Sequence, residues 1–138
     1  MNTVTRDELK KLFKKVKHLR LPPDLEAVQF DKIHYFCWYD NSDDVAYLIT
    51  EINGKLEGLR GEVTRMPVRA SMMNQCSICH QGREFQDVML FCAKRKRLPK
   101  GVYYHVTGTY ICCDYQVCNQ DMKNSEQIDR FFGQILYT

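Results

Sequence analysis

Two pairs of cysteines constrain the fold of this chain more than any other feature. The first pair is Cys76 and Cys79, and the second is Cys112 and Cys118, which begins 33 residues after Cys79. Thiolates are preferred ligands in closed tetrahedral zinc sites, and a Cys-x2-Cys turn places two sulfur atoms on one metal ion. Both pairs can bind the same ion only if the intervening chain folds back. The sequence therefore predicts one structural Zn²⁺ and a tertiary contact across it.

The order of elements around these cysteines favours a treble clef. The Cys-x2-Cys turn is followed by two strand-like segments, 85–93 and 101–111, and then by a short helix expected to begin near Cys118. A zinc ribbon would carry both ligand pairs on turns of the Cys-x2-Cys type. Here the second pair has five intervening residues, which fits a strand end followed by the first turn of a helix.

The identity of the third ligand is open between two adjacent residues, Cys112 and Cys113. Neighbouring side chains on a strand point to opposite faces, so only one of them reaches the metal easily. The spacing favours Cys112. Cys37 and Cys92 lie in apolar, strand-like segments, and we expect them to be small buried hydrophobic residues. His80 is expected to be a surface imidazole, with replacement of a cysteine ligand as the alternative.

The N-terminal part of the chain predicts a helix over residues 6–18. Thr5 and Glu8 form a capping box before it, and Pro22 follows it. Apolar residues recur along one stripe of this helix, and lysines occupy the remaining surface. The stripe is Leu9, Leu12, Phe13, Val16 and Leu19, and the lysines are Lys10, Lys11, Lys14, Lys15 and Lys17.

An antiparallel meander of three strands is expected next, over residues 33–39, 45–52 and 56–66. Asn53-Gly54 between the last two is a strong hairpin signal, because both turn residues must accept a positive φ. Gly58 and Gly61 inside the third strand indicate a bulge or a close approach of another group.

A final helix is expected after Ser125. Its apolar residues are Ile128, Phe131, Phe132, Ile135 and Leu136. Phe131 and Phe132 are adjacent and diverge by about 100° on a helix, so we expect one in the core and the other exposed. The fold class is therefore α+β: an N-terminal helix, an antiparallel β meander and a C-terminal treble-clef zinc finger with a terminal helix. One domain of residues 1–138 is expected, with a helix-and-sheet part (1–70) and a zinc-finger part (71–138).

Composition and charge exclude several classes of protein. The 20 basic and 17 acidic residues give a net charge of +3, which does not by itself demand nucleic acid. No apolar run approaches the roughly 20 residues that span a bilayer, and the N-terminus lacks a signal peptide. We therefore expect a cytoplasmic protein with no membrane partner, most simply a monomer. In a reducing compartment, its seven cysteines are better explained by metal binding than by disulfides.

A catalytic role for the zinc is not supported by the sequence. A catalytic site keeps an open coordination position beside a general base, whereas four thiolates close the coordination shell. The chain has no His-Glu-x-x-His motif, no deaminase signature and no glycine-rich phosphate loop. We expect no catalytic residues and no small-molecule substrate. Cys76 to His80 also matches the c-type haem attachment pattern, but that interpretation requires export and leaves the second cysteine pair unexplained.

The chain resembles the C-terminal zinc-binding domain of the FusB-type elongation factor G-binding proteins, the fusidic acid resistance family. The matching segments are 12–17 with Pro22, 55–62, 76–79, Tyr110-Ile-Cys112 and Cys118-Asn119. The resemblance implies Cys76, Cys79, Cys112 and Cys118 as the ligands. It also implies a protein without catalytic residues, which binds elongation factor G and helps to release it from a ribosome on which fusidic acid has trapped it. Full-length members carry a helical domain before the segment matched here.

The resemblance also implies a partner-binding surface around the zinc finger. Tyr110 and Phe131 occupy positions at which the family places contact aromatics. Two positions depart from the family: Gln75 replaces an aromatic residue and Thr107 replaces a lysine. The alternative is a treble clef that binds RNA or the ribosome through residues 94–97 and the lysines of the first helix.

Overall fold

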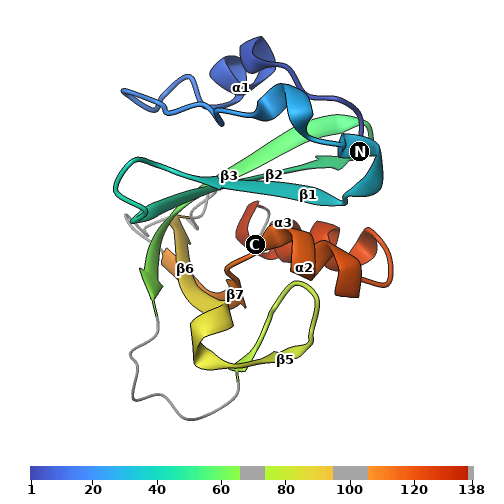
Figure 1. Cartoon of the computed structure of the whole chain (residues 1–138). Coiled ribbons are helices and arrows are strands. Elements are labelled where there is room, and N and C mark those ends of the chain that lie inside the picture. The colour runs from blue at the N-terminus through green and yellow to red at the C-terminus, as the bar shows by residue number, and fades with distance from the viewer. Residues whose placement is uncertain (66–73, 95–105, 137–138) are drawn as a thin grey trace, which may run out of the picture.

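A five-stranded antiparallel sheet lies at the centre of the molecule, with helical layers on both faces (Figure 1). The computed structural model describes residues 1–65, 74–94 and 106–136. The strand order is β1-β2-β3-β6-β7. The strands are β1 (Tyr35–Tyr39), β2 (Val45–Ile52), β3 (Lys55–Arg65), β6 (Val88–Lys94) and β7 (Val106–Cys112). The α+β class predicted from the sequence is confirmed.

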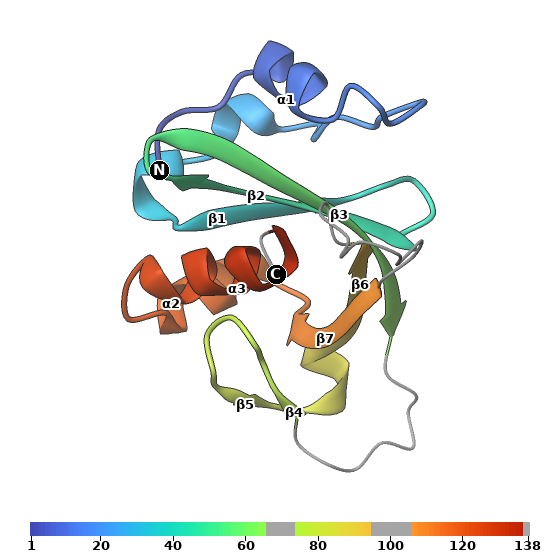
Figure 2. The same cartoon turned by 180° about the vertical axis from the view of Figure 1, so that it is seen from behind.

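The remaining elements lie on either side of this sheet. One face is covered by α1 (Arg6–Leu12) and the segment that follows it, with the 3-10 turns η1 (Leu25–Ala27) and η2 (Phe30–Lys32). The other face is covered by α2 (Tyr115–Asp121) and α3 (Glu126–Leu136), and the reverse view shows the same layering (Figure 2). The short pair β4 (Asn74–Gln75) and β5 (Gly82–Arg83) and the turn η3 (Phe85–Asp87) complete the zinc-finger part.

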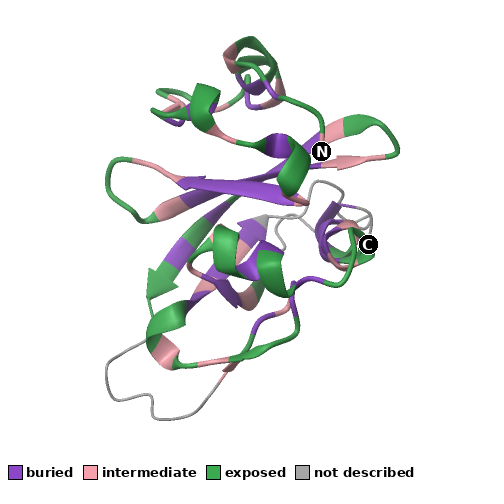
Figure 3. Cartoon of the chain, turned by 45° about the vertical axis from the view of Figure 1, so that its right-hand side comes forward, coloured by how far each residue is buried: buried purple, intermediate pink, exposed green. Residues whose placement is uncertain are grey.

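Alternation along β1 and β2 divides the buried residues into two cores. In β1, Tyr35 and Cys37 face the core under α2 and α3, whereas Phe36 and Trp38 face the core under α1. The same alternation in β2 separates Ala46 and Leu48 from Tyr47 and Ile49. Strands that are buried on both faces read as continuous apolar runs, which explains the unbroken apolar segments of the sequence. Figure 3 shows the resulting buried bands along the sheet.

The β2–β3 hairpin forms as predicted. Asn53 and Gly54 adopt φ values of 53° and 76°, the left-handed pair that a tight two-residue hairpin turn requires. Beyond the hairpin, β3 continues to Arg65 and pairs with β6, in a register that sets Val63 opposite Phe91. This pairing joins the two predicted parts, 1–70 and 71–138, in one sheet.

Helix α1 is shorter than the predicted range of 6–18. The capping box of Thr5 and Glu8 is present, but the helix ends at Leu12. Phe13 leaves helical geometry, and its ring makes edge contacts with Trp38 and Tyr47 at centroid separations of 5.9 and 5.2 Å. A longer helix would also have set like-charged lysines three and four residues apart, which is unfavourable. Aromatic packing and lysine repulsion therefore both favour the early end.

Gly58 and Gly61 mark close approaches rather than bulges, since the β2–β3 register is uninterrupted. A Cβ atom on Gly58 would lie 2.6 Å from the ring of Phe13. A Cβ atom on Gly61 would lie 2.6 Å from the ring of Phe91 and 2.9 Å from the carbonyl oxygen of Cys92. Each core therefore has one aromatic ring seated directly on the backbone of β3.

The terminal helix differs from its prediction at one point. Phe131 and Phe132 are both buried, at 3% and 0% exposure, so the expectation that one of them is exposed is wrong. The reason is that α3 fills the core broadly: Phe131 contacts the ring of Phe91, while Ile128 and Ile135 are also buried. The described part of the chain has no helix with the length and apolar character needed to cross a membrane.

The other strand predictions are correct in kind and inexact at their ends. The predicted strand 33–39 begins at Tyr35, and the first residues of 85–93 form η3. The predicted strand 101–111 is observed from Val106 to Cys112. Residues 101–105 lie outside the described residues, as do Met66, the basic residues 95–97 and His105.

We predict that Gly61→Ala lowers the free energy of unfolding by about 1–3 kcal/mol, because the added methyl group collides with a buried ring and a backbone carbonyl. Chemical denaturation would measure the change. Gly133→Ala in α3 is the matched control, because nothing lies within 4 Å of its Cβ position. It should stabilise the protein by roughly 0.5–1 kcal/mol. Equal effects of the two substitutions would contradict the prediction.

Candidate metal centre

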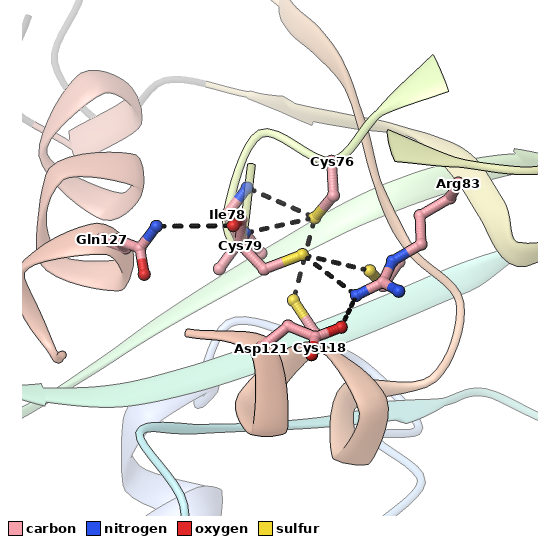
Figure 4. Close-up of polar contacts among 8 residues, drawn as sticks. Cys76, Ile78, Cys79, Arg83, Cys118, Asp121 and Gln127 are labelled. Atoms are coloured by element: carbon pink, nitrogen blue, oxygen red, sulfur yellow. Dashed lines mark hydrogen bonds and ion pairs between the residues drawn. The ribbon is translucent and has the colours of Figure 1, made fainter. Parts of the chain in front are cut away.

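Four cysteines from three parts of the fold meet beside the sheet (Figure 4). Cys76 and Cys79 lie on the turn between β4 and β5, and Cys112 is the last residue of β7. Cys118 lies in the first turn of α2, where its backbone N–H donates to the carbonyl of Asp114 at 3.1 Å. A knuckle, a hairpin and a helix start are the parts of a treble clef, as predicted.

The geometry of the four sulfur atoms fits zinc. All four lie within 4.8 Å of one another, and all four residues are buried. The Cys76 and Cys118 sulfurs are 3.8 Å apart, and the Cys79 and Cys112 sulfurs are 3.7 Å apart. A tetrahedral ion with Zn–S bonds of about 2.3 Å requires sulfur–sulfur separations of about 3.8 Å. The cluster is therefore a structural zinc site, in which the four thiolates would complete the coordination shell of the ion.

The Cys76–Cys79 turn is shaped to present its sulfurs. The backbone N–H groups of Ile78 and Cys79 point at the Cys76 sulfur, at 3.3 and 3.5 Å. His80 closes the turn with a φ of 64° and donates its N–H to the carbonyl of Cys76 at 2.8 Å. N–H groups aimed at a sulfur stabilise the thiolate form. The His80 side chain is exposed and lies 3.3 Å from the Gln127 amide, so it is a surface imidazole as expected.

Arg83 brings a positive charge next to the thiolates of the site. Four thiolates on Zn²⁺ carry a net charge of −2, and the Arg83 Nη2 atom lies 3.5 Å from the Cys79 sulfur. The same nitrogen forms an ion pair with Asp121 at the end of α2, which raises the pKa of Arg83. Arg83 therefore connects the knuckle to the helix that supplies Cys118. Sequence reasoning missed this residue, since an arginine seven residues after Cys76 has no distinguishing pattern.

The sulfurs of the cluster share protons in the absence of metal. Hydrogen bonds from the Cys112 and Cys118 sulfurs lower the pKa of Cys76 to about 7, and they lower that of Cys79 further. Cys118 keeps its proton, and its pKa is raised because it donates to these neighbours. Cys112 also keeps its proton, because its hydrogen bond with Cys118, which lowers its pKa, is outweighed by those with Cys76 and Cys79, which raise it. Two of the four sulfurs therefore favour the thiolate form that binds zinc, and zinc binding must release the protons of the other two.

Cys113 is not part of the cluster. Its sulfur lies 2.9 Å from the Arg65 Nη1 atom, and its carbonyl accepts a hydrogen bond of 2.7 Å from the Tyr39 hydroxyl. The choice of Cys112 over Cys113 thus agrees with the geometry. Cys37 is buried as expected, at 8% exposure. Cys92 is only half-buried, because alternation places it on the outer face of β6, away from the core.

Asn119 attaches α2, the helix that carries Cys118, to the edge of the sheet. Its side-chain oxygen accepts N–H bonds from His34 at 2.6 Å and Tyr35 at 3.3 Å. Its amide nitrogen donates to the carbonyls of Tyr35 at 3.0 Å and Tyr115 at 2.7 Å. One buried amide therefore satisfies both backbone groups of Tyr35 at the start of β1. This gives a physical reason for an asparagine directly after the fourth cysteine.

The two predicted contact aromatics have different environments. Tyr110 is half-buried on β7, and its carbonyl accepts an N–H bond from Ser77 of the knuckle at 2.9 Å. Phe131, on α3, is buried against the sheet. Of the two positions that depart from the family, Gln75 is exposed and donates to the His80 carbonyl at 2.9 Å. Thr107 lies in β7 opposite Ala93.

Comparison with known proteins decides the family. Residues 9–132 match the family model described as the FBP C-terminal treble-clef zinc-finger. The chain belongs to this family. The match covers most of the chain and includes all four cysteines, so the zinc finger and its single structural zinc ion are properties of the family as well as of this geometry.

A solved structure supports the same assignment. The chain is similar to the fusidic acid resistance protein FusC, with a TM-score of 0.78 and 29% sequence identity. The similarity covers 98% of this chain and 60% of the FusC chain. The resemblance to the FusB-type resistance family is therefore confirmed, and this chain spans three-fifths of the relative it matches. A search of the curated proteins found no match.

We predict that Cys112→Ser abolishes stoichiometric zinc binding and unfolds the zinc-finger half, because metal binding and folding are coupled in such sites. Cys113→Ser is the matched control and should retain full zinc content and a wild-type melting temperature. Metal analysis and thermal unfolding would measure both variants. Wild-type zinc content in Cys112→Ser would contradict the assignment of that ligand.

We also predict that Arg83→Gln weakens zinc binding by roughly 10–100-fold, the usual range for groups that hold a metal ligand in place. The removed guanidinium contacts both Cys79 and Asp121. Competition with a chromophoric chelator would measure the affinity. Arg130→Gln, an exposed site on α3, is the control. Equal affinities for the two variants would show that Arg83 does not support the metal.

Proposed function

We propose that this chain is a non-catalytic binding module for elongation factor G and that it promotes release of the factor from the ribosome. The observation that carries the proposal is the similarity to a fusidic acid resistance protein over 98% of the chain, together with the family match. Proteins of the FusB type, which the sequence resembles, act by binding that factor.

The chemistry of the zinc site supports a structural rather than a catalytic role. Four thiolates complete a tetrahedron around zinc and leave no position for water or substrate. All four cysteines are buried, so the ion lies beneath the protein surface. We therefore propose that the metal's role is to hold the surrounding surface in one shape.

Tyr110 is the residue we place at the centre of the contact surface. It stands two positions before Cys112 on β7, and the cross-strand register puts it beside Leu90 on the outer face of the hairpin. The Ser77 N–H holds its backbone, and the hydroxyls of Ser77 and Thr109 are hydrogen-bonded to each other. The knuckle thereby restricts the backbone that carries the ring, which lowers the entropic cost of binding.

Phe131 contributes to the surface indirectly in this proposal. At 3% exposure it cannot make a broad contact, but its ring packs on Phe91 and Phe132 and so holds α3 against the sheet. Val117, beside Cys118 on α2, is a large apolar side chain that is 39% exposed. We propose it as an additional contact that the sequence pattern did not reveal.

Release of the factor would follow from binding that favours one state of the factor. A ligand shifts an equilibrium only by its differential affinity for the two states, so the module must bind the released factor more tightly than the trapped one. We propose that this occurs in the cytoplasm, with the chain acting as a monomer. A readout for the release step is the fraction of factor that co-sediments with fusidic acid-stalled ribosomes.

We predict that zinc-loaded protein binds purified elongation factor G and that Tyr110→Ala weakens the affinity by about 30-fold, corresponding to a contact worth about 2 kcal/mol. Calorimetric titration would measure both affinities. Tyr110→Phe should retain most of the binding if the ring makes the contact.

Tyr115→Ala is a second control for this experiment. Tyr115 is a half-buried tyrosine as well, but its ring packs edge-on against Phe36, 5.0 Å away, and it contacts both cores. It should leave the affinity for the factor unchanged. Absence of binding by the wild-type protein at micromolar concentrations would end the proposal for this chain.

A further inference from the structure

The described structure has a second surface that the proposed contact with elongation factor G does not use. Five lysines lie within eight residues of chain on the layer formed by α1 and the turn after it: Lys10, Lys11, Lys14, Lys15 and Lys17. All five are exposed. We refer to them as the lysine face.

One of the two basic runs of the sequence lies on this segment. Residues 10–20 contain six of the 20 basic residues and none of the 17 acidic ones, which leaves 14 basic and 17 acidic residues elsewhere. These 11 positions therefore carry six positive charges and no negative one; residues 94–100, with five basic residues and no acidic one, are the other basic run of the sequence. A cluster of one sign creates a local potential that attracts ligands of the opposite sign.

The lysines of this face are not neutralised within the described part of the chain. No ion pair there joins any of the five to an acidic residue. Two acidic residues of the layer are engaged elsewhere: Glu8 closes the capping box with Thr5, and Glu26 pairs with Arg6 at 2.7 Å. Asp7, in the first turn of α1, is exposed and forms no ion pair with a lysine among the described residues. The positive charge is thus available to an external partner.

The backbone beneath the lysine face is held firmly to the sheet. Leu9 is fully buried, and the ring of Phe13 rests on Gly58 in the core under α1. The end of the segment is anchored where the Trp38 indole donates to the Arg20 carbonyl at 2.8 Å. The lysine stems therefore extend from a backbone that is packed on the sheet on both sides of the run.

From these observations we propose that the lysine face binds the phosphate backbone of RNA. A membrane surface is disfavoured, because an interfacial helix needs a free apolar face, and the apolar residues of this segment pack inward on the sheet. The choice of RNA among polyanions rests on the proposed function, since a protein that acts on a translation factor meets ribosomal RNA.

The position of the lysine face permits binding to both partners at once. The zinc site belongs to the core under α2 and α3, whereas the lysine face covers the core on the opposite side of the sheet. Figures 1 and 2 show α1 and the zinc-finger elements on opposite sides of the sheet. The chain would then hold the factor on one side and RNA on the other.

The test is fluorescence anisotropy of zinc-loaded protein with a labelled uridine oligomer, read from 50 to 200 mM salt. Five phosphate contacts on a single strand predict a slope of about −3.5 in log affinity against log salt, and about a 100-fold loss over that range. The triple variant Lys10→Gln, Lys14→Gln, Lys17→Gln should reduce the slope by about 2 and the affinity at least tenfold.

The matched control removes the same charge elsewhere. The triple variant Lys32→Gln, Lys55→Gln, Lys123→Gln alters three exposed lysines outside the lysine face. It should retain most of the affinity and the slope. Equal losses in the two triple variants would show that net charge alone is responsible and would overturn the proposal. Tighter binding to anionic phosphatidylglycerol vesicles, to a glutamate polymer or to a DNA oligomer of the same length would also overturn it.

The two proposals are separated by their variants. Tyr110→Ala should leave the affinity for RNA unchanged, and the lysine-face variant should leave the affinity for elongation factor G unchanged. Binding to RNA without binding to the factor would refute the proposed function alone. Binding to the factor without measurable binding to RNA would refute only the proposal that the lysine face binds RNA.

Discussion

The bonding of four thiolates to one zinc ion is the interaction on which the rest of this structure depends. It joins a turn, a strand end and a helix start that are separate in the chain. Because the ligands lie in the same buried cluster as Leu48 and Phe91 of the sheet, the metal also completes a hydrophobic core. A domain of this size buries only about two-thirds of its unfolded surface, so a metal-centred core contributes substantially to stability.

Two residues that do not bind the metal connect the segments that carry its ligands to each other and to the sheet. Arg83 contacts both the Cys79 sulfur and Asp121, while Asn119 binds the backbone at the start of β1. Through them, α2 is attached both to the knuckle and to the sheet. The proposed binding surface around Tyr110 therefore belongs to a zinc finger whose helix is fixed at two points.

The sheet separates two sets of side chains with different tasks. One face carries the zinc-centred core, and the other carries aromatic packing between Phe13, Trp38 and Tyr47. This division follows from strict alternation along strands that are buried on both sides. It also separates the two proposed binding surfaces, so that a ligand on one side leaves the other accessible.

Much of this arrangement follows from the sequence alone, because its signals are local. The capping box at Thr5, the Asn53-Gly54 turn and the cysteine spacing each act over a few residues, and each appears in the structure as predicted. The sequence also predicted a bulge or a close approach at Gly58 and Gly61, without deciding between them or identifying the group that approaches.

The tertiary structure decided what local pattern cannot. Helix α1 ends at Leu12 because Phe13 packs against rings contributed by β1 and β2. Phe131 and Phe132 are both buried because a helix packed into a deep core covers more than one stripe. The pairing of β3 with β6, and the roles of Arg83 and Asn119, depend on contacts between residues far apart in the chain. The energies of these contacts arise only after the chain has folded back. The sequence by itself therefore determined the metal site and the kinds of helices and strands, whereas three-dimensional packing determined where these elements end and how they contact one another.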